Sequence, residues 1–297
     1  MNDATTASNK VAFIGMGVMG YPMAGHLQRA GQDTCVYNRT TEKSQHWVAE
    51  YGGRSAPTPA LAADGAAVVC LCVGNDDDVR SVVYGDHGVL SRMVPGTVLV
   101  DHTTTSATLA EELAAACAER GVHFMDAPVS GGQVGAENGR LTIMCGGEPD
   151  VFARVEPSLA AYAAHLQLMG GHGQGQRCKM VNQVLIAGIL QGLSEGVTLA
   201  QAAGLDMDEV ITALQQGAAG SWQLNNRAST MAKGEFNFGF AIDWMRKDLG
   251  IVLDEAKRLG VHLPLAKETD ARYARLQAEG LGRMDTSVLI KALKPNA

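Results

Sequence analysis

Three glycines near the N-terminus are the first residues whose spacing indicates chemistry. They lie in the stretch VAFIGMGVMGYPMA (11–24) and fit the pattern Gly-x-Gly-x-x-Gly, after an apolar strand-like run and before a helix-like one. In a dinucleotide-binding loop the first glycine makes a tight turn, the second lets the backbone approach the pyrophosphate, and the third lets helix and strand pack closely. The alternative is a turn that is merely rich in glycine. We favour a dinucleotide at a helix N-terminus, held by Gly15, Met16, Gly17, Val18, Met19 and Gly20.

The residues after the second strand-like run bear on which dinucleotide is bound. A site for NAD usually has an acidic residue there, about 20 residues beyond the glycines, to bind the ribose 2′-hydroxyl. This chain has Asn38, Arg39 and Thr40 instead, and Asp33 lies at the wrong end of the run. An arginine can bind a 2′-phosphate through charged hydrogen bonds, and neutral side chains can add to them. These residues favour NADP, with NAD still possible; the alternative is that Arg39 is an ordinary solvated residue.

Three further polar stretches could serve the oxidation of an alcohol, which needs a hydride acceptor, a base and groups that hold the substrate. They are DHTTTSA (101–107), DAPVSGG (126–132) and GGHGQGQRCKMVNQ (170–183). The first two follow strand-like runs, and open α/β sheets bind their ligands at the carboxyl ends of strands. These stretches could therefore supply the base and the groups that hold the substrate.

The elements that position these stretches alternate through the first half of the chain, which predicts a parallel sheet covered by helices on both faces. The expected strands are 11–15, 34–38, 67–72, 97–101, 122–126 and 140–145. The expected helices between them are 18–30, 41–51, 76–84 and 106–120.

The second half has helical periodicity and no convincing strand. The expected helices are 176–203, 207–216, 221–232, 241–259, 264–279 and 285–292, with Asp206 and Asp285 as N-caps, Gly260 at a helix end and Pro264 at a helix start. The fold class is therefore α/β: an N-terminal Rossmann-type doubly wound sheet, then an all-α C-terminal domain joined by a long helix. We expect a disordered lead-in at 1–9, an NADP-binding domain at 10–169, and a helical domain for substrate binding and oligomerisation at 170–297.

Composition excludes several function classes. The chain of 297 residues is 46% hydrophobic and has a formal net charge of −7, without a basic stripe for nucleic acid. No apolar run approaches the roughly 18–20 residues of a membrane span, and the N-terminus lacks the apolar core of a secretory signal. We expect a cytoplasmic protein that binds neither nucleic acid nor membrane. The six cysteines suit a reduced core, and the scattered histidines have no ligand spacing, so no metal is expected.

Five stretches taken in order resemble the motifs of the β-hydroxyacid dehydrogenase family, which includes 3-hydroxyisobutyrate dehydrogenase, tartronate semialdehyde reductase and glyoxylate/succinic semialdehyde reductase. They are GMGVMGYPMA, DHTTTSA, DAPVSGG, GHGQGQRCKMVNQ and WMRKDLG, and the resemblance covers residues 10–293. It implies an NADP-dependent oxidoreductase that interconverts a small β-hydroxy acid and its semialdehyde or keto acid by hydride transfer. It also implies a substrate in the cleft between the two domains.

The resemblance implies that Lys179 is the catalytic acid/base. A lysine in the first turn of a helix, in an apolar setting, has its pKa lowered both by burial and by the positive helix end. Asn182 and Gln183 would share its face and bind the substrate or orient the lysine. The family often has Asn four residues after the lysine, where this chain has Gln183, so the two roles stay open.

The family likeness also assigns the remaining site residues. Ser130, Gly131 and Gly132 match the cradle for the substrate carboxylate, although glycine pairs also make plain tight turns. The expected contacts to the cofactor are Val73, Gly74, Asn75, Thr103, Thr104 and Lys247. For Lys247 a solvated surface lysine is the alternative.

Other functions remain open at this stage. One is an NAD-linked dehydrogenase of serine-like hydroxy acids. An imine reductase or a non-catalytic cofactor-binding module is disfavoured because Lys179 is present. The resemblance implies a homodimer or homotetramer, and the physiological substrate is left undetermined.

Overall fold

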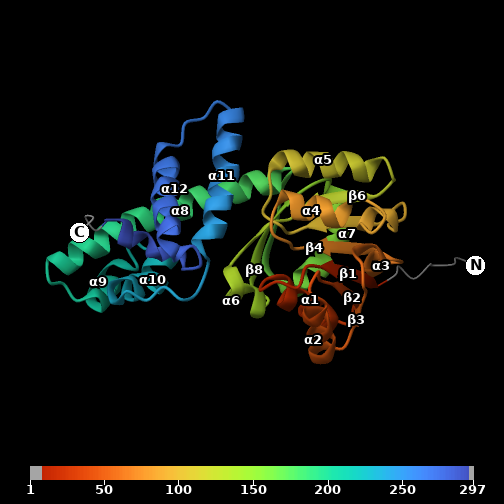
Figure 1. Cartoon of the computed structure of the whole chain (residues 1–297), viewed down its shortest axis with the longest axis horizontal. Coiled ribbons are helices and arrows are strands. Elements are labelled where there is room, and N and C mark those ends of the chain that lie inside the picture. Colours follow the sequence, from red (N-terminus) through yellow and green to blue (C-terminus); the bar gives the residue numbers. More distant parts are fainter. Residues whose placement is uncertain (1–8, 294–297) are drawn as a thin grey trace, which may run out of the picture. The chain divides into compact units, whose positions relative to one another are not determined.

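The computed structural model describes residues 9–293. The chain divides after Lys179 into two compact units, here called the sheet unit (9–179) and the helical unit (180–293) (Figure 1). The predicted lead-in lies outside the described residues apart from residue 9.

The sheet unit is built on a mixed, mostly parallel sheet of Rossmann type, as predicted. Its strands within the described residues are β1 (Lys10–Ile14), β2 (Asp33–Tyr37), β3 (Arg54–Ser55), β4 (Val68–Leu71), β5 (Val98–Asp101), β6 (His123–Asp126), β7 (Val129–Ser130), β8 (Leu141–Gly146) and β9 (Ala163–Gly170). Their order is β3-β2-β1-β4-β5-β6-β8-β7, and β9 pairs with β8. From β3 to β6 all neighbours are parallel.

The sheet differs from the prediction in the direction of one strand and in three strands that were not expected, of which β3 and β7 have two residues each. The strand expected at 140–145 is present as β8, but it runs antiparallel to β6 and β7. No strand was expected at β9, whose side chains are mostly exposed or half-buried. A strand at this exposed position lacks the continuous apolar run by which the buried strands are recognised.

Helices connect the strands and cover the sheet. They are α1 (Gly20–Arg29), α2 (Thr41–Tyr51), α3 (Pro59–Ala63), α4 (Asp76–Val83), α5 (Ala107–Ala118), α6 (Gly132–Glu137) and α7 (Pro149–Leu159), with short 3₁₀ turns at Val89–Ser91 and Ala160–Tyr162. The four predicted helices are confirmed as α1, α2, α4 and α5.

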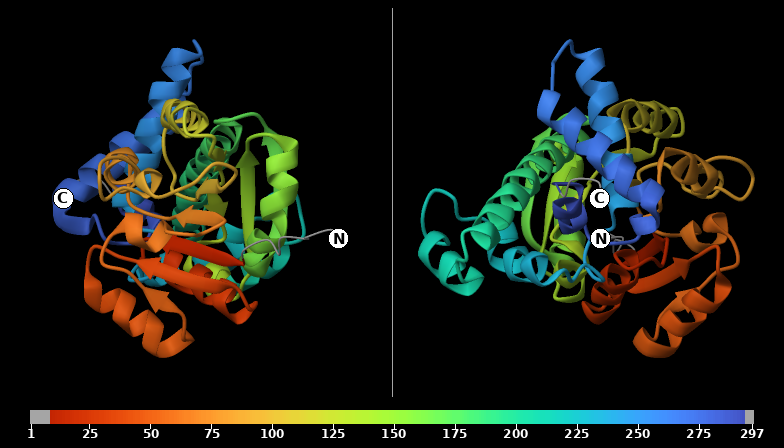
Figure 2. Two further views of the ribbon diagram at one scale, coloured as in Figure 1. Left: turned by 90° about the vertical axis from the view of Figure 1, so that its right-hand side faces the viewer. Right: turned by 60° about the vertical axis from the view of Figure 1, so that its left-hand side comes forward.

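Two cores lie on the two faces of the sheet, and strands β1, β2, β4, β5 and β6 contribute side chains to both. Val11 and Phe13 of β1 pack in one core, whereas the alternate residues Ala12 and Ile14 pack in the other. The first core lies under α1, α2 and α7, and the second lies under α3, α4 and α5 (Figure 2). Burial on both faces explains why the strands read as continuous apolar runs.

The helical unit begins within a long helix whose first residues belong to the sheet unit. Its helices are α8 (Gln174–Ala202), α9 (Met207–Leu214), α10 (Trp222–Lys233), α11 (Ile242–Arg258) and α12 (Pro264–Leu276), followed by a π turn at Gln277–Leu281 and a 3₁₀ helix at Thr286–Leu293. The helices predicted after 176 are confirmed, except that the last is 3₁₀ rather than α-helical. Asp206 caps α9 by accepting the N–H groups of Asp208 and Glu209.

Helix α8 is long and apolar enough to cross a membrane, although no membrane span was expected from the sequence. By length and composition it could cross a membrane, with a mean hydropathy of 1.3 in its most apolar window. Ala187, Leu190 and Val197 of this helix are buried in the core of the helical unit. A core helix of a globular unit gives the same signal. Since 39% of that window is buried, this packing accounts for part of the apolar length of α8.

Candidate functional site

In the glycine loop after β1, the fold requires glycine at positions 15 and 20 but not at position 17. Gly15 has a φ of +103°, and a Cβ at this residue would collide with the backbone oxygen of Cys72. A Cβ on Gly20 would collide with the oxygen of Gly15 and lie 2.9 Å from the Phe13 ring. Around Gly17, in contrast, no atom lies within 4 Å of the Cβ position. The loop thus has open backbone at the position where the motif lets a pyrophosphate approach.

The neighbouring residues of the loop differ in exposure. Met16 is buried, Met19 packs against the first core, and Val18 is 66% exposed. The open backbone near a helix N-terminus fits a phosphate-bearing ligand.

The residues after β2 have separate tasks. Asn38 braces the glycine loop, because its Oδ1 accepts the N–H of Met16 at 2.9 Å and its Nδ2 donates to the oxygen of Thr40 at 3.0 Å. The Arg39 side chain is 88% exposed and forms an ion pair with Asp78 at 3.6 Å. Arg39 therefore offers a charged donor beside the loop, whereas the amide of Asn38 is used by the fold.

The loops after β4 and β5 are tied together. The N–H of Val73 donates to the Thr103 hydroxyl oxygen at 3.0 Å, and Thr103 is buried. Thr104, next in the chain, is half-buried. Of the two threonines expected at the cofactor, Thr103 thus links the loops and Thr104 is the more accessible.

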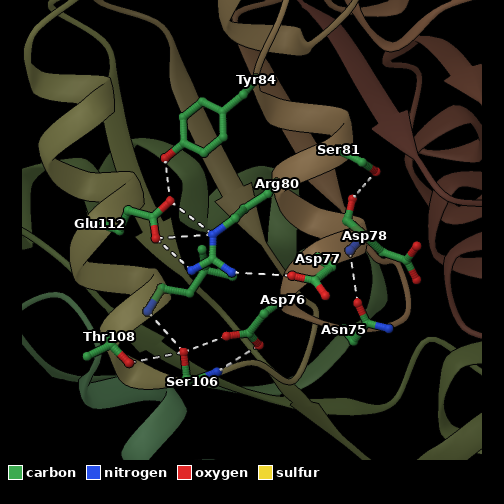
Figure 3. A network of polar contacts seen from close by, with 11 residues as sticks. Asn75, Asp76, Asp77, Asp78, Arg80, Ser81, Tyr84, Ser106, Thr108 and Glu112 are labelled. Atoms are coloured by element: carbon green, nitrogen blue, oxygen red, sulfur yellow. Dashed lines mark hydrogen bonds and ion pairs between the residues drawn. The ribbon is translucent and has the colours of Figure 1, made fainter.

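An acidic run at the start of α4 had no explanation in the sequence, and the structure supplies one (Figure 3). Asn75 caps α4 by accepting the N–H of Asp78 at 2.9 Å. Asp76 accepts both the N–H and the hydroxyl of Ser106, at 3.1 and 2.6 Å. Acidic groups in the first turn also interact favourably with the positive end of the helix dipole. Asp76 thus links the start of α4 to the loop after β5.

Arg80 extends this network one turn further along α4 (Figure 3). Its guanidinium contacts Glu112 of α5 at 2.7 Å and Asp77 at 3.6 Å, and Tyr84 donates to Glu112 at 3.0 Å. The side chains are partly exposed, so their value lies in fixing the geometry of α4 and α5 more than in stability.

Ser130, Gly131 and Gly132 form a turn that requires glycine. Gly131 and Gly132 have φ angles of +126° and +62°, and both are exposed, while Ser130 ends β7 and is half-buried. The tight turn and the anion cradle are compatible readings, because positive φ angles can turn successive N–H groups toward one side.

Lys179 lies deeper in its helix than expected. The helix begins at Gln174 rather than 176, so Lys179 is its sixth residue and not a member of the first turn. The field of the helix terminus is weaker there. The side chain is nevertheless buried, with 8% of the residue exposed.

A second polar cluster belongs to the helical unit. Gln183 is 2% exposed and donates to Asp248 at 2.6 Å, while Asn182 donates to the Gln183 oxygen at 2.7 Å. Lys247 forms an ion pair with the other oxygen of Asp248 at 3.2 Å. Asp248 thus orients both amides, and sequence reasoning missed it. The available signal was a charge in WMRKDLG at helical spacing from the apolar residues Met245 and Val252, both of which are buried.

Two carboxyls lie side by side where β5 and β6 end. Asp101 and Asp126 are partners in the sheet, and both are buried. Burial raises the pKa of Asp101 to about 7 and that of Asp126 to about 6, while hydrogen bonds from backbone N–H groups oppose both shifts. His102 beside them bonds to the Ala127 oxygen and the Tyr162 hydroxyl, and burial lowers the pKa of its imidazole to about 4. This histidine serves the core, and within residues 9–293 no group of three or more potential ligands could hold a metal.

Both halves of the chain match known protein families. The NAD binding domain of 6-phosphogluconate dehydrogenase matches residues 10–171, and the NAD-binding domain of NADP-dependent 3-hydroxyisobutyrate dehydrogenase matches 173–293. The chain belongs to the β-hydroxyacid dehydrogenase family. It is therefore an oxidoreductase that acts on a hydroxyl group with NAD(P) as cofactor.

Individual relatives align over nearly their whole length. An uncharacterized oxidoreductase of Shewanella frigidimarina is 55% identical over 96% of this chain and 98% of its own. The 2-hydroxy-3-oxopropionate reductase of Escherichia coli is 34% identical over 96% and 97%. The crystal structure of 3-hydroxyisobutyrate dehydrogenase from Salmonella typhimurium has a TM-score of 0.84 at 32% identity, covering 95% of this chain and 99% of that one.

The glycine loop of this dehydrogenase yields a paired prediction. Gly17→Ala meets no atom, so we expect its thermal midpoint to stay within about 2 °C of wild type, while the affinity for NADPH falls at least about tenfold. Gly20→Ala overpacks the loop and should lose about 1–3 kcal/mol of stability. Thermal unfolding and fluorescence titration with NADPH check both. Equal affinity of Gly17→Ala and wild type would contradict the assignment of this loop.

Asp101 yields a prediction on pH. Its folded-state pKa of about 7 lies above its ordinary value of 3.8, so the folded protein binds the proton more tightly and its stability falls as pH rises from about 4 through 7. In Asp101→Asn the amide oxygen can still accept the N–H of Thr103, and the side chain at position 101 no longer ionises. Thermal midpoints at pH 5 and 8 should therefore show the variant gaining on wild type at the higher pH. The exposed Asp86→Asn is the control, and an equal difference at both pH values would refute the prediction.

Proposed function

We propose that this dehydrogenase uses NADP to interconvert a small β-hydroxy acid of the 3-hydroxyisobutyrate type and its semialdehyde or keto acid. One observation carries the proposal. The side chain of Gln176, at the start of α8, bonds to the backbone of Thr103 and Thr105 in the loop after β5. That loop lies at the carboxyl edge of the sheet, as does the glycine loop. Lys179, three residues after Gln176, therefore belongs to the same edge of the sheet as the nucleotide loop.

The residues present fit a nicotinamide dinucleotide. The open backbone at Gly17 and the start of α1 would hold the pyrophosphate. Arg39 would bind the 2′-phosphate, and the loops that contain Val73, Gly74 and Thr104 would flank the remainder. When bound, the nicotinamide ring accepts or supplies a hydride.

Lys179 is proposed to hold the proton that this reaction requires. In the direction of oxidation its neutral Nζ takes the hydroxyl proton as the carbon–hydrogen bond gives up its hydride. In the direction of reduction its ammonium gives a proton to the carbonyl oxygen. Burial of the side chain supports this role, because it keeps bulk water away from the transferring proton.

The substrate carboxylate is assigned to the turn of Ser130, Gly131 and Gly132. The N–H groups of these two exposed glycines and the serine hydroxyl are suitable donors. The names of two relatives support a small hydroxy acid, since 2-hydroxy-3-oxopropionate and 3-hydroxyisobutyrate both join a carboxylate to a nearby hydroxyl or oxo group. Of the two amides after Lys179, we assign the substrate contact to Asn182, because Gln183 is buried against Asp248.

We further propose a cytoplasmic homodimer or homotetramer. Apolar side chains of α8 within the helical unit support an oligomer, because Val181, Leu185 and Leu199 are 59%, 60% and 71% exposed. Exposed apolar surface of this kind is typical of contacts between protein chains.

The role of Lys179 is tested by Lys179→Ala and Lys179→Met. Loss of the proton carrier should lower kcat at least about 100-fold, as is usual for a positioned acid or base, with the Kd for NADPH within about threefold of wild type. Lys233→Ala in α10 is the control, since it is a lysine at a helix end outside the proposed site. The assay is NADPH oxidation with short semialdehydes; full turnover in both Lys179 variants would reject the proposal.

The proposed preference for NADP over NAD is tested at Arg39. Arg39→Ala should weaken NADPH binding about 10- to 100-fold, the loss expected for a charged hydrogen bond, and leave NADH binding unchanged. Asp78→Asn removes the carboxylate that pairs with Arg39, so it should bind NADPH as well as wild type or better. Titration by nicotinamide fluorescence separates the outcomes. Equal affinities for the two nucleotides, unchanged in Arg39→Ala, would instead indicate the NAD-linked enzyme.

A further inference from the structure

Asp126 and Gln176 are buried polar side chains that the proposed reaction does not use. Both are 0% exposed. Asp126 ends β6, and Gln176 lies in the first turn of α8. Their hydrogen bonds join the helix that carries Lys179 to two strand ends of the sheet unit.

Asp126 binds the first turn of α8 with both carboxyl oxygens. One accepts the N–H of Gly173 at 2.7 Å, and the other accepts the N–H of Gln176 at 2.8 Å. The first N–H groups of a helix have no partner within the helix, and an acidic group there also favours the positive helix end. Asp126 therefore does what an N-cap does, but from a strand 47 and 50 residues earlier in the chain.

Gln176 fixes the same turn to a second loop. Its amide oxygen accepts the N–H of Thr105 at 3.1 Å, and its amide nitrogen donates to the oxygen of Thr103 at 2.7 Å. Only a side chain with both a donor and an acceptor can make this pair of bonds. The two bonds set the rotation of α8 about its own axis relative to the loop after β5.

Close packing removes the remaining freedom of this turn. A Cβ on Gly175 would collide with the backbone oxygen of Met144 and lie 2.8 Å from a carboxyl oxygen of Asp126. Gly146 of β8 leaves equally little room, because a Cβ there would lie 2.8 Å from the nitrogen of Gly175. The first turn of α8 thus has one position against the sheet.

We propose that Asp126 and Gln176 are positioning residues that set the place and direction of the Lys179 side chain. The inference rests on the proposed function of Lys179. Three residues of helix separate Gln176 from Lys179, a rise of about 4.5 Å, so a rotation or shift of the first turn reaches the lysine directly. A misplacement of about 1 Å at a reacting group can cost about 100-fold in rate.

The experiment measures hydride transfer in single turnovers, where slow variants remain measurable, together with the Kd for NADPH. In wild type both carboxyl oxygens of Asp126 accept backbone N–H groups. In Asp126→Asn one of these oxygens is replaced by an NH₂ group, which donates and so cannot accept. Gln176→Leu keeps much of the volume and removes both bonds to the loop. We expect each variant to slow hydride transfer at least tenfold while the Kd for NADPH stays within about threefold. Asp150→Asn, an exposed acidic residue in the first turn of α7, should change neither quantity.

A double-mutant cycle with Lys179→Ala separates positioning from a structural role. If Asp126 and Gln176 act through Lys179, their variants should slow hydride transfer less than about twofold when Lys179 is absent. An equal cost in both backgrounds, an unchanged rate in the wild-type background, or a parallel loss of NADPH affinity would overturn the inference. Should Asp126→Asn fail to fold, the cycle with Gln176→Leu decides it. Full turnover in Lys179→Ala would instead refute the proposed function, so the two failures are distinguishable.

Discussion

The two hydrogen bonds from the start of α8 to Asp126 are the constraint on which the rest of the site depends. They connect the last residue of a central strand to the helix that carries Lys179. Without them the long helix would be held to the sheet unit mainly by the bonds of Gln176 and by packing around Gly175. The glycine loop and the start of α8 lie at the same edge of the sheet, because the loop follows β1 and the first turn of α8 is bonded to the end of β6 and to the loop after β5.

This arrangement places ionisable groups where their charges are costly. Asp101 and Asp126 are neighbours in the sheet and are both buried, so burial raises the pKa of each carboxyl. Each is partly compensated by backbone N–H groups: Thr103 donates to Asp101, and Gly173 and Gln176 donate to Asp126. A buried carboxyl is tolerated when donors surround it. Here those donors belong to the loop after β5 and to the start of α8, so the bonds that order these segments also offset part of the cost of burial.

The sequence predicts those parts of the fold that depend on local pattern. Strands buried on both faces appear as apolar runs, and the glycine spacing after β1 indicates a turn that the positive φ of Gly15 bears out. The antiparallel direction of β8 could not be read in this way, because it depends on which neighbour the strand pairs with. The depth of Lys179 was misjudged by two residues, since α8 begins at the side chain of Asp126, which is distant in sequence.

In the candidate site, too, the sequence predicts what depends on local pattern and not what depends on distant partners. The residue types at positions 15–20, 130–132 and 179 could be selected from the motifs alone, but the partners of those motifs could not. Asp76, Gln176 and Asp248 act across elements far apart in the chain, on Ser106, Thr103 and Gln183. No local pattern encodes such a pairing; a polar residue at an apolar position is the only trace that it leaves.

Asp248 shows what such a trace can mean. Its carboxylate lies in the core side of α11, where a charge is costly unless it is paired. It is paired twice, with the Lys247 ammonium on one oxygen and the Gln183 amide on the other. Because the Gln183 oxygen then receives the amide of Asn182, the carboxylate fixes the orientation of both amides that follow Lys179. In each unit a buried aspartate thus orders polar residues near Lys179: Asp126 at the start of the helix, and Asp248 at the two amides. A glutamine at 183 suits this arrangement, since its longer side chain reaches the carboxylate while its oxygen still accepts from Asn182.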